Sequence, residues 1–232
     1  MENTEQKPSI YLVLNCSEEN LQVVFGTPGQ VLWTTDVFAP GRAMKHIAPG
    51  IRAGLDSLEI QSGDLAGITC VQGPGSFTGI RMVFAHAQGM AMGARIPMSK
   101  ICGFDALISG PGPLLHGPAW IFIHSRRNQV YARGYLLPSL QPLSPAACMS
   151  LENITELVKP RPGQAVNVLG SGVRRNPKYF TSDIWNILPR IWDIPLPQVL
   201  LDLSTESSFA SEPLFPGYLR LSDAEEKLAN SY

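Results

Sequence analysis

The first part of the chain alternates between short apolar runs and polar turns. Apolar runs at residues 10–14, 21–25 and 31–37 are separated by polar or glycine-containing turns, which predicts three antiparallel strands. Residues 42–58 then carry apolar side chains three and four positions apart, the spacing of a helix with one buried face. The chain therefore opens with a predicted β-meander followed by an amphipathic helix.

The next segments predict alternating strands and helices. The pattern favours strands at residues 65–71 and 96–101 and helices at about 76–93 and 104–109. Three antiparallel strands extended by strand–helix–strand crossovers give a mixed sheet covered by helices. We therefore predict an α/β fold of the ribonuclease-H-like class, the lobe used by actin, Hsp70-type ATPases and sugar kinases.

A stretch rich in proline and glycine, residues 110–118, predicts a linker between two lobes. The first lobe would span residues 9–110 and the second residues 118–232. Periodicity fades beyond residue 138, and no internal repeat is visible in the sequence. We expect a smaller, irregular second lobe. Its predicted elements are strands at 119–124, 129–137 and 166–169 and a helix at 151–158.

Composition narrows the classes of function. The 232 residues are 44% hydrophobic but only 16% charged, and the formal net charge is −1. The charged fraction is below the usual value of about 25%, which favours a neutral surface partly covered by a partner. A net charge near zero argues against a dedicated nucleic-acid binder with a broad basic face.

The sequence also predicts the location of the protein and the absence of a metal. No apolar run approaches the roughly 18 residues that cross a bilayer, and the polar first nine residues do not resemble a secretory signal. We therefore expect a cytoplasmic protein without a membrane contact. The four cysteines and four histidines show no zinc-site spacing, so no metal is predicted.

The most informative local feature lies between a predicted strand and a predicted helix. Glycines at this position allow a tight turn and a close backbone approach, and the free amides of the next helical turn could hold an anion. Geometry alone favours a tight turn without a ligand. The residues of this motif turn are Gly73, Pro74, Gly75, Ser76, Phe77, Thr78, Gly79 and, two positions later, Arg81.

The motif turn and the stretch Ala87-Gln88-Gly89-Met90-Ala91 resemble the bacterial TsaB (YeaZ) family. That family supplies the dimerisation subunit for making threonylcarbamoyladenosine at position 37 of tRNA. Weaker likenesses occur at residues 10–17, 168–172 and 216–220. The resemblance implies a TsaD-like catalytic partner, a TsaE-like ATPase in the same assembly, contact with tRNA only through the complex, and no catalysis by this chain itself.

Two departures from the family pattern concern the nucleotide cleft. The resemblance assigns this degenerate cleft to Asn15, Cys16, Ser17, Gly170, Ser171 and Gly172. The family has Asp-Thr-Ser where this chain has Asn15-Cys16-Ser17, and an asparagine lacks the charge that holds magnesium. A second aspartate of the pattern is replaced by His124. No cofactor is predicted for the isolated chain, and ATP binding at a subunit interface stays open.

The helix at 76–93 is apolar almost all round, so it requires cover on more than one side. Ala85, Gly89 and Gly93 are four apart and would let another helix approach closely. The resemblance places the subunit contact on this helix and on the helix at 42–58. The expected partner-binding residues are Met44, Ile47, Ile51, Ile80, Val83, Phe84, Ala87, Met90 and Ala91.

Three alternatives to a partner subunit stay open at this point. The second helix could be an ordinary core helix. The chain could be an independent small-molecule kinase or ATPase of the same superfamily, which Asn15 disfavours because phosphoryl transfer relies on magnesium held by acidic ligands. It could also be a homodimeric scaffold that uses the same helix face, because a two-fold contact needs only one self-complementary patch.

Overall fold

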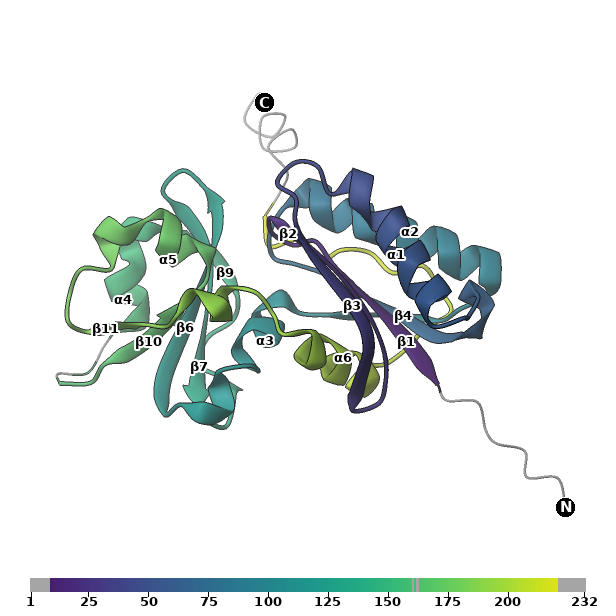
Figure 1. Ribbon diagram of the computed structural model, residues 1–232. Coiled ribbons are helices and arrows are strands. Elements are labelled where there is room, and N and C mark those ends of the chain that lie inside the picture. Colours follow the sequence, from purple (N-terminus) through teal and green to yellow (C-terminus); the bar gives the residue numbers. More distant parts are fainter. Residues whose placement is uncertain (1–8, 160, 162, 221–232) are drawn as a thin grey trace, which may run out of the picture. The chain divides into compact units, whose positions relative to one another are not determined.

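The computed structural model describes residues 9–220 apart from 160 and 162, and these form two compact units (Figure 1). The first unit holds the described residues up to Val71, together with Thr78–Ile101 and Pro197–Phe215. The second holds Gln72–Phe77, Cys102–Leu196 and the described residues from Pro216 onward. Each unit has its own sheet and its own core.

The described part of the first unit has a five-stranded mixed sheet in the order β3-β2-β1-β4-β5. Strands β1, β2 and β3 pair antiparallel, whereas β1 pairs with β4 and β4 with β5 in parallel. This is the predicted meander extended by crossovers. The strands are β1 (Ile10–Asn15), β2 (Asn20–Thr27), β3 (Gln30–Phe38), β4 (Leu65–Val71) and β5 (Met98–Ile101).

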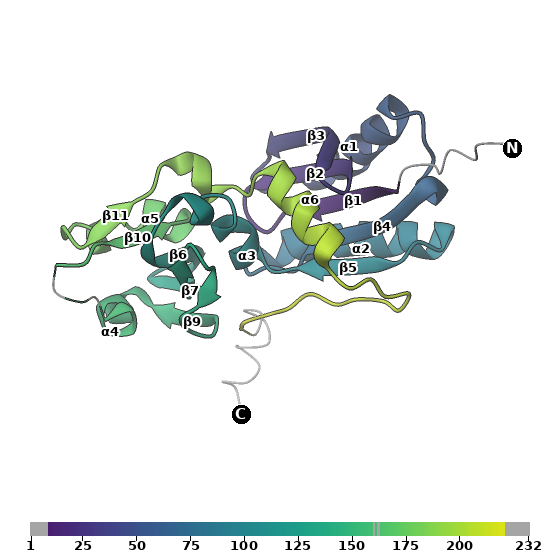
Figure 2. The same cartoon turned by 90° about the horizontal axis from the view of Figure 1, so that it is seen from below.

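Helices cover both faces of this first sheet. Helices α1 (Met44–Ser57) and α2 (Phe77–Ala94) lie on one face and α6 (Pro197–Glu206) lies on the other (Figures 1 and 2). A short 3₁₀ turn, η1 (Ser62–Asp64), precedes β4. Alternating residues of each strand point to opposite faces, so the apolar strands meet α1 and α2 on one side and α6 on the other.

A segment after α6 protects the edge of the first sheet. We call residues 208–215 the C-terminal strap. Met98 of β5 and Ala210 exchange two backbone hydrogen bonds of 2.8 Å, and the Gln88 side chain donates to the Leu214 carbonyl at 2.7 Å. An uncovered edge strand is a template for unwanted pairing. The strap therefore shields β5 with the chain's own later residues.

The described part of the second unit also has a mixed sheet, with six strands in the order β11-β10-β6-β7-β8 and with β9 paired to β7. Strands β6 and β7 are antiparallel, whereas β10 runs parallel to both β6 and β11. The strands are β6 (Gly117–Arg126), β7 (Gln129–Leu137), β8 (Gln141–Pro142), β9 (Ala147–Ser150), β10 (Val166–Leu169) and β11 (Trp185–Ile187).

The two sheets follow one plan. In the first sheet, β1 pairs antiparallel with β2 and parallel with β4. In the second sheet, β6 pairs antiparallel with β7 and parallel with β10. The second sheet therefore has a regular topology and includes strands β8, β9 and β11, which the sequence does not predict. Strands β9 and β11 are four and three residues long, too short for a two-residue period to become visible in the sequence.

Short helices complete the second unit, and the compact units differ from the predicted domain ranges. Residues 197–215, which the sequence places in the second lobe, belong to the first unit, and the predicted linker runs into β6. The helices are α3 (Gly103–Ile108), α4 (Ile154–Val158) and α5 (Ser171–Arg175), with 3₁₀ turns η2 (Gly112–Leu114), η3 (Leu151–Asn153), η4 (Pro177–Tyr179) and η5 (Arg190–Asp193).

Candidate functional site

The outward face of α1 and α2 is the first candidate site. On α2 a stripe of exposed residues at Arg81, Ala85, Gly89, Met92 and Gly93 follows the helical repeat. Met92 is 79% exposed, and Met44 at the start of α1 is 63% exposed. These are large apolar side chains on a surface that carries small residues between them. The stripe is where another helix could approach.

The nine residues expected at the partner contact do not form one surface. Met44 is exposed, whereas Met90 and Ala91 are half-buried against the core. The widest apolar stripe of each helix faces the sheet, because burying it gains the most free energy. The residues buried in the first unit's core are Ile47, Ile51, Ile80, Val83, Phe84 and Ala87.

Within the described residues, nothing packs against the two glycines of the α2 stripe. No described atom lies within 4 Å of the position that a Cβ would take at Gly89 or at Gly93. Glycine in an exposed helix interior costs about 1 kcal/mol relative to alanine. By contrast, a Cβ at Gly54 of α1 would lie 2.2 Å from the Phe25 ring, so that glycine is required by packing.

An apolar groove of about 420 Å³ lies beside the C-terminal half of α2. The strap forms its second wall through Pro213 and Phe215, and Phe215 is 70% exposed. The groove is not predicted from the sequence, because neither α6 nor the strap is predicted. Pro197 at the first helical position followed by the run Val199–Leu201 is a helix-start signal that could have revealed α6.

The motif turn packs against residues 216–220 within the second unit. The Gly73 carbonyl accepts a hydrogen bond from the Gly103 amide at 2.8 Å. The Phe77 and Tyr218 rings stack with centroids 4.8 Å apart, and the Arg220 guanidinium lies 5.2 Å from the Phe77 centroid. Arg220 Nε also donates to the Tyr131 hydroxyl at 3.1 Å. Two segments singled out by the resemblance therefore meet.

Within the motif turn the residues have different surroundings. Gly73 and Pro74 are buried and Gly75 is half-buried, whereas Ser76 and Thr78 are exposed. Gly79 is required by sterics, because a Cβ there would lie 2.0 Å from the Cys16 carbonyl oxygen. Arg81 is exposed on the outward face of α2. The turn is thus held by close backbone packing at Gly79 and by ring stacking at Phe77.

The first-strand turn satisfies its own polar groups. Asn15 is 4% exposed, and its Oδ1 accepts from the Ser17 amide at 3.0 Å and from the Ser17 hydroxyl at 2.8 Å. Its Nδ2 donates to Gln22 Oε1 at 2.8 Å. Both ends of the Asn15 amide are thus occupied within the first unit. The arrangement orders the turn and leaves Asn15 a poor ligand for a cation.

The glycine turn of the second unit is likewise occupied by a protein carboxylate. The Gly170 amide donates to Asp193 Oδ1 at 2.8 Å, and Arg174 Nε donates to Asp193 Oδ2 at 2.6 Å. Arg174 also donates to the Leu188 carbonyl. A Cβ at Gly172 would lie 2.6 Å from the Phe122 carbonyl oxygen. The Ser171 hydroxyl accepts from the His124 amide at 2.9 Å.

A buried tyrosine of the second unit is paired with a carboxylate. The Tyr135 hydroxyl donates to Asp105 Oδ1 at 2.5 Å, and Arg133 Nη1 lies 3.3 Å from the same oxygen. Burial, and then this hydrogen bond, raise the pKa of Tyr135. Among the described residues, no three His, Cys, Asp or Glu side chains gather closely enough to hold a metal ion.

Comparisons with known proteins agree with this architecture. Residues 40–172, more than half of the chain, match the family model of TsaD, tRNA N6-adenosine threonylcarbamoyltransferase. The Bacillus subtilis (strain 168) tRNA threonylcarbamoyladenosine biosynthesis protein TsaB is 28% identical over 190 residues, which cover 79% of this chain and 82% of that protein. An uncharacterised Mycobacterium tuberculosis (strain H37Rv) protein is 31% identical over 53% of each chain.

Solved structures support the fold. YeaZ from Pseudomonas aeruginosa superposes with a TM-score of 0.74 at 21% identity, covering 91% of this chain and all of that one. The ethanolamine utilization protein EutJ from Carboxydothermus hydrogenoformans gives a TM-score of 0.53 at 8% identity, over 85% of this chain and 90% of that one. The predicted ribonuclease-H-like class is confirmed. In the described residues, no helix combines the length and apolarity needed to cross a bilayer.

Proposed function

The chain belongs to the TsaB (YeaZ) family, and we propose that it is a non-catalytic subunit that binds a TsaD-like catalytic protein during N6-threonylcarbamoylation of adenosine 37 in tRNA. Membership of the family implies involvement in tRNA threonylcarbamoyladenosine biosynthesis. A TsaE-like ATPase would join the same assembly. The proposal assigns the transfer chemistry to the partner and the docking surface to this chain.

The exposed stripe of α2 is the observation that supports the partner contact. No described atom lies near the Cβ positions of Gly89 and Gly93, and a second backbone packed against them would offset their cost to the helix. Met44 of α1 and Met92 of α2 add exposed apolar surface to these two helices. Methionine tolerates imperfect packing at interfaces. Burial of about 800 Å² per partner would make a stable contact.

The polar turns support a non-catalytic role. The Asn15 amide is engaged by Ser17 and Gln22, and the Asp193 carboxylate already holds the Gly170 amide. A kinase or ATPase would need those groups for phosphate and magnesium. Calorimetry with ATP and magnesium on the isolated chain tests this point. Turnover by the isolated chain would replace the proposal with the kinase or ATPase alternative.

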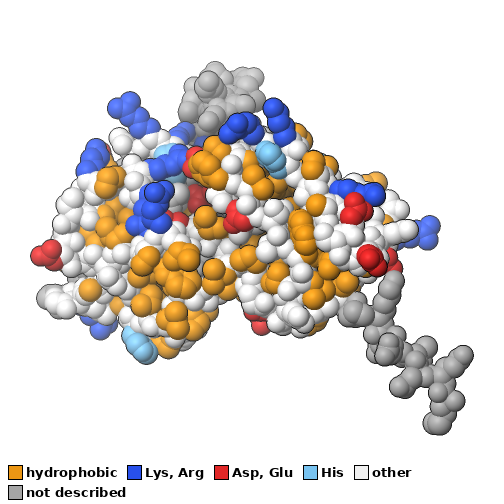
Figure 3. Space-filling view, viewed as in Figure 1, with side chains coloured by type: hydrophobic (Ala, Val, Ile, Leu, Met, Phe, Trp, Pro, Cys, Tyr) orange, Lys and Arg blue, Asp and Glu red, His pale blue; other side chains and the backbone are white. Residues whose placement is uncertain are grey.

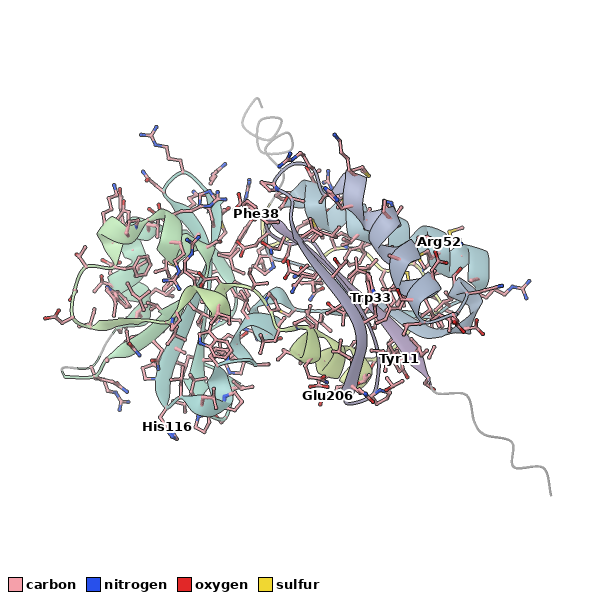
Figure 4. All side chains as sticks on the ribbon, viewed as in Figure 1. Tyr11, Trp33, Phe38, Arg52, His116 and Glu206 are labelled. Atoms are coloured by element: carbon pink, nitrogen blue, oxygen red, sulfur yellow. The ribbon has the colours of Figure 1, made fainter. Side chains whose placement is uncertain are left out.

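Gel filtration of the chain co-expressed with a TsaD-like protein tests the contact. Gly89→Leu and Met92→Glu change only the exposed stripe, so both variants should fold and should no longer co-elute with the partner. Phe38→Glu on β3 is a matched control, because Phe38 is 65% exposed and stands five positions after Trp33 (both labelled in Figure 4). The Trp33 ring faces α1, so strand alternation directs Phe38 to the opposite face of the sheet. Phe84→Glu is unsuitable, because Phe84 is 2% exposed and a charge there would disrupt the core.

The outcomes separate the partner subunit from a homodimeric scaffold. If the wild-type chain elutes as a dimer of itself and ignores the TsaD-like protein, the scaffold alternative holds. If both stripe variants co-elute with the partner as well as the wild type does, the contact lies elsewhere and the assignment to α2 is wrong.

A further inference from the structure

Charge is divided unevenly between the two units. In Cys102–Leu196 of the second unit, Lys and Arg outnumber Asp and Glu by nine to five. In the described residues of the first unit the order reverses, with six basic and nine acidic side chains. The net charge of −1 for the whole chain therefore conceals a basic second unit, and it does not exclude contact between that unit and a nucleic acid.

The topology of the second sheet gathers basic residues at one end. Strand β10 runs parallel to β6, with Leu169 opposite Ile121, so the carboxyl ends of both strands lie at the same edge of the sheet. Strand β6 ends at Arg126 and is followed by Arg127 in the turn to β7, and beyond β10 comes α5 with Arg175. Helix α5 contacts β6 directly, because the Ser171 hydroxyl accepts a hydrogen bond from the His124 amide.

We define the basic edge as Arg126, Arg127, Arg175 and Lys178, all of which are exposed. Figure 3 shows Lys and Arg side chains gathered over α5 and the β6–β7 turn, at the upper left of that view. The neighbouring Arg174 does not belong to this set. Its side chain is only 21% exposed and its guanidinium is held by Asp193 and the Leu188 carbonyl, so it serves the fold of the second unit.

We infer that the basic edge binds the phosphodiester backbone of RNA, an inference that rests on the proposed role in tRNA modification. Three of the four side chains are arginines, whose planar guanidinium groups match phosphate oxygens in bidentate geometry. The charges come from two separate parts of the chain, the β6–β7 hairpin and the α5–η4 segment, and they lie on an exposed surface. This arrangement fits a strand of phosphates better than one small anion. The chain would then contact tRNA directly, beyond its role in holding the catalytic subunit.

Fluorescence anisotropy of the full chain with a labelled tRNA transcript tests this inference. The double variants Arg126→Gln/Arg127→Gln and Arg175→Gln/Lys178→Gln each remove two charges from the basic edge. The matched control is Lys159→Gln/Arg161→Gln, which removes two exposed charges from the α4–β10 connection at the opposite end of β10. Titrations at about 50 and about 200 mM salt give the salt dependence of each affinity.

Each basic-edge variant is expected to weaken tRNA binding by about tenfold at the lower salt concentration. The slope of log affinity against log salt should become shallower by about 0.7–0.9 for each phosphate that the variant no longer neutralises. The control should stay within about twofold of the wild type. Equal effects of control and basic-edge variants, or no salt-dependent tRNA binding by the wild type, would overturn the inference.

Co-elution with a TsaD-like protein distinguishes this result from failure of the proposed function. The Arg126→Gln/Arg127→Gln variant should still co-elute with the partner, because its substitutions lie outside the α2 stripe. A variant that fails to bind the partner but keeps tRNA binding would identify the basic edge as a contact for an acidic protein surface, and the inference would be rejected. Unchanged thermal midpoints confirm that each variant is folded.

Discussion

Gly79 and Cys16 approach so closely that a Cβ at residue 79 would lie 2.0 Å from the Cys16 carbonyl oxygen. The neighbour is backbone, so it cannot move aside as a flexible side chain would. Gly79→Ala should therefore displace the start of α2 from the first-strand turn and lower the free energy of unfolding by about 1–3 kcal/mol or more. Urea unfolding followed by circular dichroism measures the loss. An unchanged midpoint would mean that the two backbones are not in close contact.

A glycine-to-alanine substitution further along α2 should change the free energy of unfolding in the opposite direction. Gly89→Ala adds a methyl group into open space and restricts the unfolded chain, so it should raise the free energy of unfolding by about 0.5–1 kcal/mol. Thermal unfolding of the isolated chain provides the measurement. Gly54→Ala is the contrasting control, because its Cβ would meet the Phe25 ring at 2.2 Å and should destabilise the protein.

The Asp193 carboxylate joins η5 to the glycine turn of the second unit. Asp193→Ala removes the acceptor of both the Gly170 amide and the Arg174 guanidinium, and the side chains of this pair are only 11% and 21% exposed. Leaving a half-buried guanidinium without its carboxylate should cost about 2–4 kcal/mol, measured as a lower urea midpoint. Arg52 of α1 (Figure 4) pairs with Asp56, and the two side chains are 77% and 57% exposed, so Arg52→Gln should leave the midpoint unchanged.

Stability should decline at alkaline pH. Burial raises the pKa of the Cys16 thiol to about 11 and also raises the pKa of Cys70 and Tyr135. Their pKa values are lower in the unfolded chain, so the unfolded state releases protons that the folded state keeps, from about pH 9 for the two thiols and from about pH 10 for Tyr135. Each such group then lowers the free energy of unfolding by about 1.4 kcal/mol per pH unit.

Urea titrations at a series of pH values from about 8 to about 10.5 check this prediction. The Cys16→Ala/Cys70→Ala variant should start from a lower stability and show a shallower decline, because two of the titrating groups are gone. A wild-type profile that stays flat over this range would contradict the assigned burial of both thiols.

The first sheet could be predicted from sequence because its elements are long and its patterns regular. The ends of helix α2 are predicted within a residue or two, because the helix is eighteen residues long and follows a glycine turn. The face that α2 exposes could not be predicted. Both of its sides are apolar, and only the packed sheet reveals that Phe84 points inward while Met92 points outward.

The misses in the second half have a different physical origin. Strands β9 and β11 form because longer neighbours offer them hydrogen-bonding partners, β7 and β10, and so tertiary context decides their state. Helix α6 is required by the far face of the first sheet, about 100 residues away in sequence. Its Ser204 hydroxyl lies 2.6 Å from Thr69 of β4, a contact that no local pattern encodes.

The return of α6 and the strap has a consequence for synthesis of the chain on the ribosome. Leu200 and Leu201, both fully buried, belong to a helix that closes the first sheet, and Ala210 covers its edge. Both segments emerge only after the entire second sheet has been made. Because domains generally fold from the amino terminus during synthesis, the first sheet is made first but completed last. The face of that sheet that α6 covers stays exposed until α6 leaves the ribosome.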